Sequence, residues 1–389
     1  MPRWLILLHY CADMRRSLPV YAVLAFGVAL SVFVLAWVLA LRQGFVSTFA
    51  ASGSADQALV LSRSASSEVS SFLRIEHAMA LVQHDAIARG PDATPLASPE
   101  LFSISYLEVG PGETASVTVR GLSPAGAGLR RKLHITQGRM FAPGTRELLV
   151  GRGLQRRWPA LAVGHSIKLR GVAWTIVGSF DTGDASQSEL WGDVDSVQNA
   201  FGLKGYQSLL ARFATPADFE RFRSALQRDN TVNAVALGEQ EYYVKNSAQF
   251  PRAVGLIALL VGAVMACAAA VNASNSMLYL AERRRQVTAV VLAIGFKQRT
   301  VLAAMTAEAS IVAASGALIG WLCAYLIFDG RSVSTVNMQS YEMVAFNYAI
   351  GWPQAQLGLV VACIAVLVGV IAVVAKITFT PIVRMLARE

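Results

Sequence analysis

The stretch AERRRQVTAVVLAIGFKQR, residues 281–299, decides how this chain is organised. It carries five Lys or Arg residues against one acid, Glu282, and it lies between two long apolar segments. A short loop this basic stays on the cytoplasmic side of a membrane. Its interior has helical periodicity, because Val287, Val290, Val291 and Ile294 recur at spacings of three and four opposite the arginines. The stretch therefore predicts a short cytoplasmic helix between two membrane spans.

The predicted helix ends at Gly295, and Lys297 and Arg299 follow it. A charged helix with one apolar face, held between two spans, is suited to docking on a soluble partner. The same pattern also fits a positive topology anchor that lies on the inner leaflet of the membrane. Composition alone leaves both interpretations open.

The composition indicates an integral membrane protein that carries a soluble domain. The chain has 389 residues, of which 54% are hydrophobic and only 15% are charged. Four runs are uncharged or nearly so, and each is long enough to cross a hydrocarbon core of about 30 Å. These predicted spans are residues 18–41, 253–280, 300–328 and 356–376.

The positive charge is concentrated in three short segments. Residues 1–17, 281–299 and 376–389 hold +8 of the formal net charge of +9, whereas residues 42–252 are nearly balanced and the loop 329–355 is slightly acidic. The positive-inside rule then places both termini and the 281–299 segment in the cytoplasm and the other two segments outside. The basicity reports topology in the inner (plasma) membrane, so we do not expect a nucleic-acid partner.

The two ends of the chain are predicted to lie on the cytoplasmic side. Residues 1–17 place Trp4, Leu7 and Leu8 along one face of an interfacial helix, and residues 377–389 form a cytoplasmic tail. No small-residue cleavage site precedes the first span, so we expect it to be retained as a span.

Residues 42–252 read as a large extracytoplasmic α+β domain. Short β-like runs alternate there with turns rich in Gly, Pro and Ser, and residues 166–180 predict a hairpin that turns at Gly171. Helices are predicted at 74–88 and 216–228, the second with Thr215 as its cap. The fold class is thus a membrane protein with four transmembrane α-helices, one before this domain and three after it.

The sequence lacks the motifs of the common enzyme classes. It has no GxxxxGK[ST] phosphate loop, no GxSxG and no HExxH. His77 and His84 are seven residues apart on a predicted helix, a spacing that fits solvated polar residues better than a metal site. An acidic loop fits turn and cap duty or a divalent ion, and its members are Asp181, Asp184, Glu189, Asp193 and Asp195. We expect no catalysis, no metal and no cofactor on this chain.

Polar and small residues punctuate the predicted spans. Glu308 is an ionisable residue well inside a span, and it is either a hydrogen-bonded packing residue that contacts Asn272 or Asn275, or a proton relay. Gly316 and Gly320 form a GxxxG pair that permits close helix contact, within one chain or with a second copy.

The order of one span, a large outer domain and three further spans resembles the permease subunits of the MacB, DevC, LolC/LolE and FtsX superfamily of ABC systems, the type VII or mechanotransmission transporters. Residues 282–286 and 292–296 are similar to the coupling-helix pattern of that family. Residues 306–308, followed by the glycines of 316–320, resemble its next span. In the outer domain the resemblance rests on residues 135–139, 147–151, 163–164 and 174–178.

This resemblance implies a set of residues that couple the chain to an ATPase. They are Glu282, Arg283, Arg284, Arg285, Gln286, Val290, Ile294, Gly295 and Phe296. The chain departs from the family at two positions, since Gln286 stands where Glu is frequent and Thr288 stands where Gly is frequent. A salt bridge from position 286 to the ATPase is therefore not expected.

The resemblance also implies the function. We expect a non-catalytic permease that pairs with a second copy in the lipid membrane and binds a separate ABC ATPase, which carries the ATP and Mg. Movement of the outer domain would then drive efflux or extraction of a substrate, with a periplasmic adaptor and an outer-membrane duct as further partners. The alternatives are an FtsX-like regulator of cell-wall hydrolases and a lipoprotein-releasing permease.

Overall fold

The computed structural model describes residues 14–110, 112–229, 231–336 and 343–379. The described residues form two compact units. The helical unit comprises the described parts of Met1–Gln43, Ala253–Arg331 and Tyr348–Glu389, and the mixed-sheet domain comprises those of Gly44–Arg252 and Ser332–Asn347. The predicted interfacial helix at the N-terminus and the predicted C-terminal tail lie largely outside the described residues.

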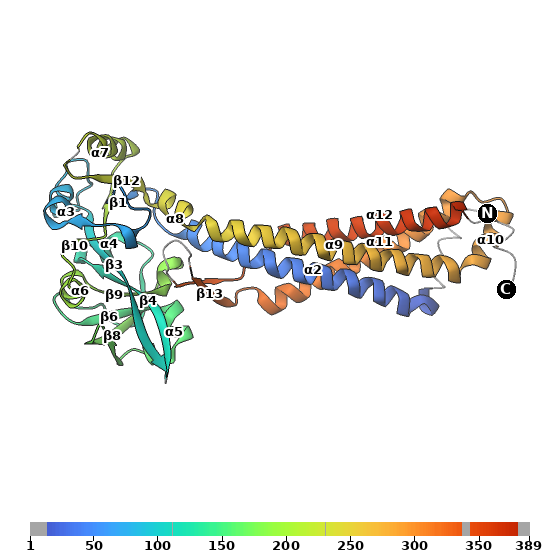
Figure 1. Ribbon diagram of the computed structural model, residues 1–389, viewed down its shortest axis with the longest axis horizontal. Helices are drawn as coiled ribbons and strands as arrows, with labels where there is room; N and C mark the ends of the chain where they lie inside the picture. The colour runs from blue at the N-terminus through green and yellow to red at the C-terminus, as the bar shows by residue number, and fades with distance from the viewer. Residues whose placement is uncertain (1–13, 111, 230, 337–342, 380–389) are drawn as a thin grey trace. The chain divides into compact units, whose positions relative to one another are not determined.

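The helical unit is built from four long helices that run side by side (Figure 1). They are α2 (Met14–Ala51), α9 (Gln249–Arg283), α11 (Gln298–Phe328) and α12 (Trp352–Phe379). Each is long and apolar enough to cross a membrane, which confirms the prediction of four apolar helices. A short helix, α10 (Arg285–Ala293), lies between α9 and α11 in the chain.

Close backbone contacts surround α2. A Cβ on Gly316 would lie 2.5 Å from the carbonyl oxygen of Ala25, and a Cβ on Gly320 would overlap the carbonyl oxygen of Ala29. Glycine removes the side chain that would hold the helices apart. The GxxxG pair of α11 therefore packs against α2 of the same chain.

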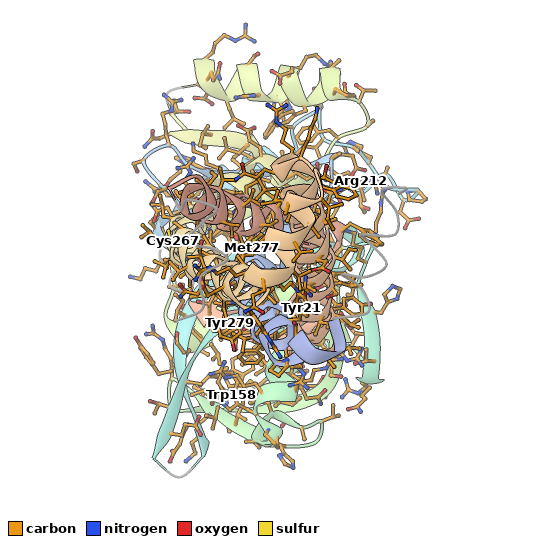
Figure 2. All side chains as sticks on the ribbon, turned by 90° about the vertical axis from the view of Figure 1, so that its right-hand side faces the viewer. Tyr21, Trp158, Arg212, Cys267, Met277 and Tyr279 are labelled. Carbon is orange, nitrogen blue, oxygen red and sulfur yellow. The ribbon has the colours of Figure 1, made fainter. Side chains whose placement is uncertain are left out.

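The interior of the helical unit is an apolar cluster to which all four long helices contribute. Its buried residues include Leu24, Val28, Met277 and Val312. The outward surfaces of the same helices are also apolar, as expected where lipid replaces water. Figure 2 labels residues of both kinds, the buried Tyr21 and Met277 and the exposed Cys267 and Tyr279.

The mixed-sheet domain is organised around a ten-stranded sheet with the order β12-β1-β11-β3-β4-β9-β6-β8-β5, and β7 pairs with β8. Neighbouring strands are antiparallel except for the β4–β9 and β6–β8 pairs, which are parallel. The strands of this sheet are β1 (Gln57–Ser62), β3 (Ala97–Gly110), β4 (Glu113–Leu122), β5 (His134–Gly138), β6 (Glu147–Gly151), β7 (Ser166–Leu169), β8 (Val172–Asp181), β9 (Glu189–Asp193), β11 (Ser208–Arg212) and β12 (Ala234–Gly238).

Two small strand pairs and a set of short helices complete this domain. β2 (Leu73–Arg74) pairs with β10 (Gly205–Tyr206), and β13 (Ser332–Val336) pairs with β14 (Met343–Asn347). The helices are η1 (Glu68–Ser70), α3 (Ile75–Val82), α4 (Pro124–Leu129), α5 (Arg152–Arg157), η2 (Pro159–Leu161), η3 (Ala185–Ser188), α6 (Val194–Phe201), α7 (Pro216–Arg228) and α8 (Glu239–Ser247).

Local sequence signals account for several of these elements. The β7–β8 hairpin is confirmed, and its two-residue loop places Arg170 and Gly171 at φ angles of 49° and 79°. A loop of two residues with positive φ matches the twist of the flanking strands. Thr215 caps α7 as predicted, since its side chain accepts a hydrogen bond from the Asp218 amide.

The predicted helix at 74–88 is shorter in the structure. α3 ends at Val82, and the His84 ring then accepts a hydrogen bond from the Ala86 amide in a turn. His77 and His84 therefore do not share a helix face. The loss of helix follows from this local side-chain contact, which competes with the helical backbone pattern.

The segment between the third and fourth long helices contributes to the mixed-sheet domain. In its β13–β14 hairpin, the Ala345 amide donates to the Ser188 hydroxyl at 2.7 Å, and Arg157 donates to Ser334. The ring of Phe346 packs edge-on against the ring of Phe45, with 5.3 Å between the two ring centres. This hairpin is thus packed into the domain rather than being a free loop, which the sequence did not indicate.

Candidate functional site: the coupling segment and buried charges

The candidate coupling segment is α10 with its flanking residues. α10 ends in a Schellman motif, in which the Gly295 amide donates to the Leu292 carbonyl at 3.0 Å and the Phe296 amide donates to the Val291 carbonyl at 3.3 Å. Gly295 has a φ of 99°, which glycine adopts without steric cost. The prediction that Gly295 ends this helix is confirmed.

α10 presents its apolar residues to the surface. Val290 is 52% exposed and Ile294 is 71% exposed, and Val287 is exposed as well. The contacts of α10 with the rest of the chain are made instead by Thr288 and Ala289, which are buried, and by Val291 and Leu292, which pack against the apolar cluster of the helical unit. Within the described part of the chain, the apolar stripe of α10 is exposed.

Charged and polar side chains border this stripe. Glu282, Arg283, Gln286, Lys297 and Arg299 are exposed. Arg285 is partly exposed and lies 3.4 Å from Glu282, and Phe296 is partly buried beside the exposed Gly295. Basic and apolar groups therefore occur together on one short helix.

The side chain of Arg284 is buried, unlike those of its neighbours Arg283 and Arg285. Its side chain is 4% exposed, so it does not belong to the outward-facing set in which the sequence grouped it. A guanidinium Nη1 donates to Glu308 Oε2 on α11 at 2.8 Å, and Nη2 donates to the hydroxyl of Tyr21 on α2 at 3.3 Å. The Tyr21 hydroxyl in turn donates to Glu308 Oε2 at 2.7 Å. We call these three residues the Tyr21–Arg284–Glu308 triad.

The expected partners of Glu308 were wrong. Asn272 donates instead to the carbonyl oxygens of Val23 and Leu24 on α2, at 3.1 and 3.4 Å. Both Asn272 and Asn275 lie on α9, whereas Glu308 takes its hydrogen bonds from α2 and from the junction between α9 and α10. A charged partner compensates a buried carboxylate better than a neutral amide does, which favours Arg284.

A second buried charge network lies in the mixed-sheet domain. Arg120 on β4 is 2% exposed and contacts Glu68, Glu100 and Glu189 at 2.9, 2.9 and 2.8 Å. Its guanidinium also lies 4.6 Å from the centre of the Phe102 ring. The three carboxylates come from η1, β3 and β9, so one arginine joins the central strands of the sheet.

Arg130 extends this network from the end of α4. It donates to both carboxylate oxygens of Glu100 at 2.7 Å and lies 5.1 Å from the centre of the Trp191 ring. Burial alone would raise the pKa of Glu100, but the charges and hydrogen bonds of Arg130 and Arg120 outweigh it and lower that pKa. Glu100 is therefore held ionised inside the domain.

A small cleft beside this network contains a carboxyl with the opposite shift. Glu239, the first residue of α8, is buried and accepts a hydrogen bond from the Ser54 amide at 2.8 Å. Its pKa is raised to about 7, chiefly by burial and in smaller part by the charges of Glu100 and Asp184, against the lowering effects of Arg130 and of the Ser54 hydrogen bond. Arg131, Lys132 and Tyr243 also line the cleft. Glu239 thus titrates near neutral pH.

The acidic loop serves turns and caps. Asp184 caps η3, Asp193 caps α6, and Asp181 accepts a hydrogen bond from Arg152. Glu189 belongs to the Arg120 network, and among the described residues no three His, Cys, Asp or Glu side chains are placed to hold a metal ion together.

Comparison with known proteins identifies the class. Residues 22–229, more than half of the chain, match the family profile of the MacB-like periplasmic core domain. Together with four apolar helices, this match defines a membrane protein of the MacB and FtsX type of ABC transporter permeases. The chain belongs to the family of the MacB-like periplasmic core domain. Permeases of this class are generally non-catalytic and work with an ABC ATPase.

Two solved structures show a distant likeness. The extracellular domain of the noncanonical ABC-type transporter YknZ from Gram-positive bacteria is 12% identical, with 46% of this chain covering 99% of that domain at a TM-score of 0.37. The periplasmic region of MacB from Actinobacillus actinomycetemcomitans is 12% identical, with 47% covering 89% at a TM-score of 0.38. Both scores are low, so the class rests on the family match. No characterised protein sequence in the comparison matches the chain.

Proposed function

We propose that this chain is the permease subunit of an ABC exporter whose ATPase is a separate polypeptide. ATP and Mg belong to that ATPase. The ATPase docks on α10, and its closure on ATP moves the helices of the permease and, through them, the mixed-sheet domain. The substrate is taken from the periplasm or from the outer leaflet and is not required to pass between the spans.

The observation that carries this proposal is the surface of α10. In this short helix between two long apolar helices, the described residues leave Val287, Val290 and Ile294 uncovered, beside exposed basic residues. Apolar side chains on an otherwise charged segment mark a protein interface, because exposing them to water is unfavourable. A helix that lies on the inner leaflet would also use an apolar face, so the α10 variants described below are chosen to separate docking from anchoring.

The proposal includes an orientation. Both termini and α10 lie in the cytoplasm of a cell with this permease in its inner membrane, and the mixed-sheet domain lies outside, because the basic segments flank the spans on one side. A cysteine introduced at Ser186 should react with an impermeant maleimide added to intact cells, and one introduced at Gln298 should react only after lysis. Labelling in the reverse order would refute the orientation.

The docking step is tested by changing α10 alone. Val290→Ser and Ile294→Ser replace exposed apolar side chains by small polar ones, and each should weaken binding of the ATPase about tenfold or more, since burying one such side chain contributes about 1.5 to 3 kcal/mol. Val244→Ser is the matched control, because Val244 is 57% exposed on α8 of the mixed-sheet domain. ATPase binding to the purified permease in nanodiscs gives the affinities.

The result distinguishes docking from anchoring. Equal ATPase binding by both α10 variants and by the control would contradict the proposed role of α10. With docking established, partners recovered through the mixed-sheet domain distinguish efflux, cell-wall regulation and lipoprotein release. A periplasmic adaptor indicates efflux, a hydrolase indicates regulation, and a second non-identical permease indicates lipoprotein release.

A further inference from the structure

The Tyr21–Arg284–Glu308 triad lies where α9 meets α10. Arg284 separates the two helices: its amide still donates to the Leu280 carbonyl at 3.0 Å, and its carbonyl accepts the first bond of α10, from the Thr288 amide at 2.9 Å. A junction between two helices is a place where a force applied to α10 could be absorbed by bending. The side chain of Arg284, the residue at this junction, is therefore the one best placed to prevent bending between α9 and α10.

The triad ties this junction to two other helices. Arg284 and Glu308 are 4% and 6% exposed, and Tyr21 is also buried. Glu308 Oε2 accepts from both partners at once, so α2, α11 and the α9–α10 junction meet at one carboxylate oxygen. Separating these groups would leave a cation and an anion buried apart, which costs far more than parting apolar surfaces. Motion of the junction must then carry α2 and α11 with it.

The neighbouring arginines differ from Arg284 in their exposure to solvent. Arg283 is exposed, and Arg285 forms a longer contact of 3.4 Å with Glu282 on the adjoining turn. An exposed ion pair of this kind contributes little to rigidity. The middle arginine of the three is thus chemically distinct from the other two, although the sequence gives all three the same appearance.

We propose that the Tyr21–Arg284–Glu308 triad is a latch that makes α10 move as one body with α2 and α11. This inference rests on the proposed docking of an ATPase on α10, and it assigns the three residues a positioning role in coupling. Force from the ATPase is passed to two spans at their α10 end and is not dissipated at Arg284. Glu308 acts through its ion pair with Arg284 and its hydrogen bonds to Arg284 and Tyr21.

The latch is first tested without the ATPase. Hydrogen–deuterium exchange of the α10 amides is measured in the permease alone, for Tyr21→Phe and Glu308→Gln. Tyr21→Phe removes the hydroxyl that bonds to both charged partners, and Glu308→Gln removes the counter-charge of Arg284 while keeping an acceptor oxygen. Each should speed exchange of residues 285–293 about tenfold or more. Tyr279→Phe is the matched control, because Tyr279 is an exposed tyrosine of α9, and it should exchange as the parent does (Figure 2).

The second measurement adds the ATPase and ATP. In the parent permease, ATP should alter the exchange of residues 298–310 of α11. In Tyr21→Phe and Glu308→Gln this response should be lost, while ATPase affinity stays within about twofold, since the exposed surface of α10 is unchanged. A residue that served stability alone would lower the yield of folded complex and leave the response of the folded fraction intact.

A double variant keeps the test decisive if a single one does not fold. Glu308→Gln alone leaves the Arg284 cation buried without its counter-charge, whereas Arg284→Gln with Glu308→Gln removes both charges and keeps polar side chains of similar length. The double variant should insert and bind the ATPase yet show the fast α10 exchange and no α11 response.

The outcomes separate this inference from the proposed function. Parental α10 exchange in Tyr21→Phe and in the double variant overturns the latch, and so does an ATP response of α11 equal to that of the parent. Failure of the parent permease to bind the ATPase overturns the docking function instead, with the α10 exchange in the permease alone still reporting on the latch.

Discussion

The raised pKa of Glu239 predicts that this residue makes the stability of the mixed-sheet domain depend on pH. Burial next to Glu100 and Asp184 raises the pKa of this carboxyl to about 7, from an ordinary value of 4.5. Glu239→Gln keeps the acceptor that the Ser54 amide uses and removes the ionisation. The substitution therefore isolates the effect of the charge from that of the hydrogen bond.

The direction in which Glu239 changes the unfolding free energy with pH follows from proton linkage. The folded state holds this proton more tightly than the unfolded chain, so the contribution of Glu239 is favourable at low pH and is lost as the pH rises from about 4.5 through about 7. A difference of about 2.5 pH units corresponds to at most about 3 kcal/mol of unfolding free energy at pH 8. For a domain of about 200 residues this corresponds to a change in Tm of roughly 6 to 12 °C.

Thermal unfolding of the purified permease at pH 5 and pH 8 is the assay. Glu239→Gln should melt like the parent at pH 5 and several degrees higher at pH 8. Glu241→Gln, two residues along the same helix and exposed, is the control and should leave the pH dependence of melting as in the parent. A difference between Glu239→Gln and the parent that is the same at both pH values would refute the reasoning.

Two further predictions concern packing and buried charge. Gly320→Ala places a methyl group on the backbone of α2 and should destabilise the helical unit by about 1 to 3 kcal/mol, seen as a lower detergent melting temperature, whereas Gly255→Ala, where a Cβ would lie 3.6 Å from its nearest neighbour, should have little effect. Equal melting temperatures of the Gly320→Ala and Gly255→Ala proteins would contradict the close contact between Gly320 and the backbone of α2. Arg120→Met leaves the buried carboxylates of Glu68 and Glu189 without their cation and Glu100 with Arg130 alone. It should lower the stability of the mixed-sheet domain by about 3 to 5 kcal/mol, against a negligible change for the exposed Arg74→Met. An Arg120→Met protein that melts as the parent does would show that the network is dispensable.

Much of the architecture is encoded locally and could be predicted. The four long helices are predictable because long apolar runs have few other uses, and α10 is predictable because Gly295 and the basic residues around it carry their signal within one short segment. The β7–β8 hairpin and the start of α7 rest on turn and cap residues that act within a few positions. These features do not depend on distant parts of the chain.

The buried charge networks depend on distant parts and could not be predicted. Tyr21 is 287 residues from Glu308 in sequence, and nothing local shows that α2 would meet α11 at that turn. The asparagines of α9 were chosen as partners because polar residues in spans tend to pair, but helix rotation decides which pairs form. One signal was present, since Arg284 and Glu308 are opposite charges at neighbouring ends of two consecutive spans.

The network around Arg120 was hidden for a related reason. Its carboxylates, Glu68, Glu100 and Glu189, lie in short segments far apart in the chain, and they meet only once the strand order is known. The residue pattern of β4 alone does not show that Arg120 faces the interior of the domain. An arginine at an inward position of an apolar strand is the pattern that would have pointed to it.

The docking of an ATPase on α10 is the central claim, and a photo-crosslink tests it most directly. A photoreactive amino acid is placed at Ile294 and, in a second protein, at Val244, each in the full permease mixed with its cognate ABC ATPase. The account predicts a crosslink to the ATPase from position 294 and none from position 244, because only α10 presents its apolar face to that partner. A crosslink from neither position, with ATPase bound to the permease, would place the docking surface elsewhere and contradict the account.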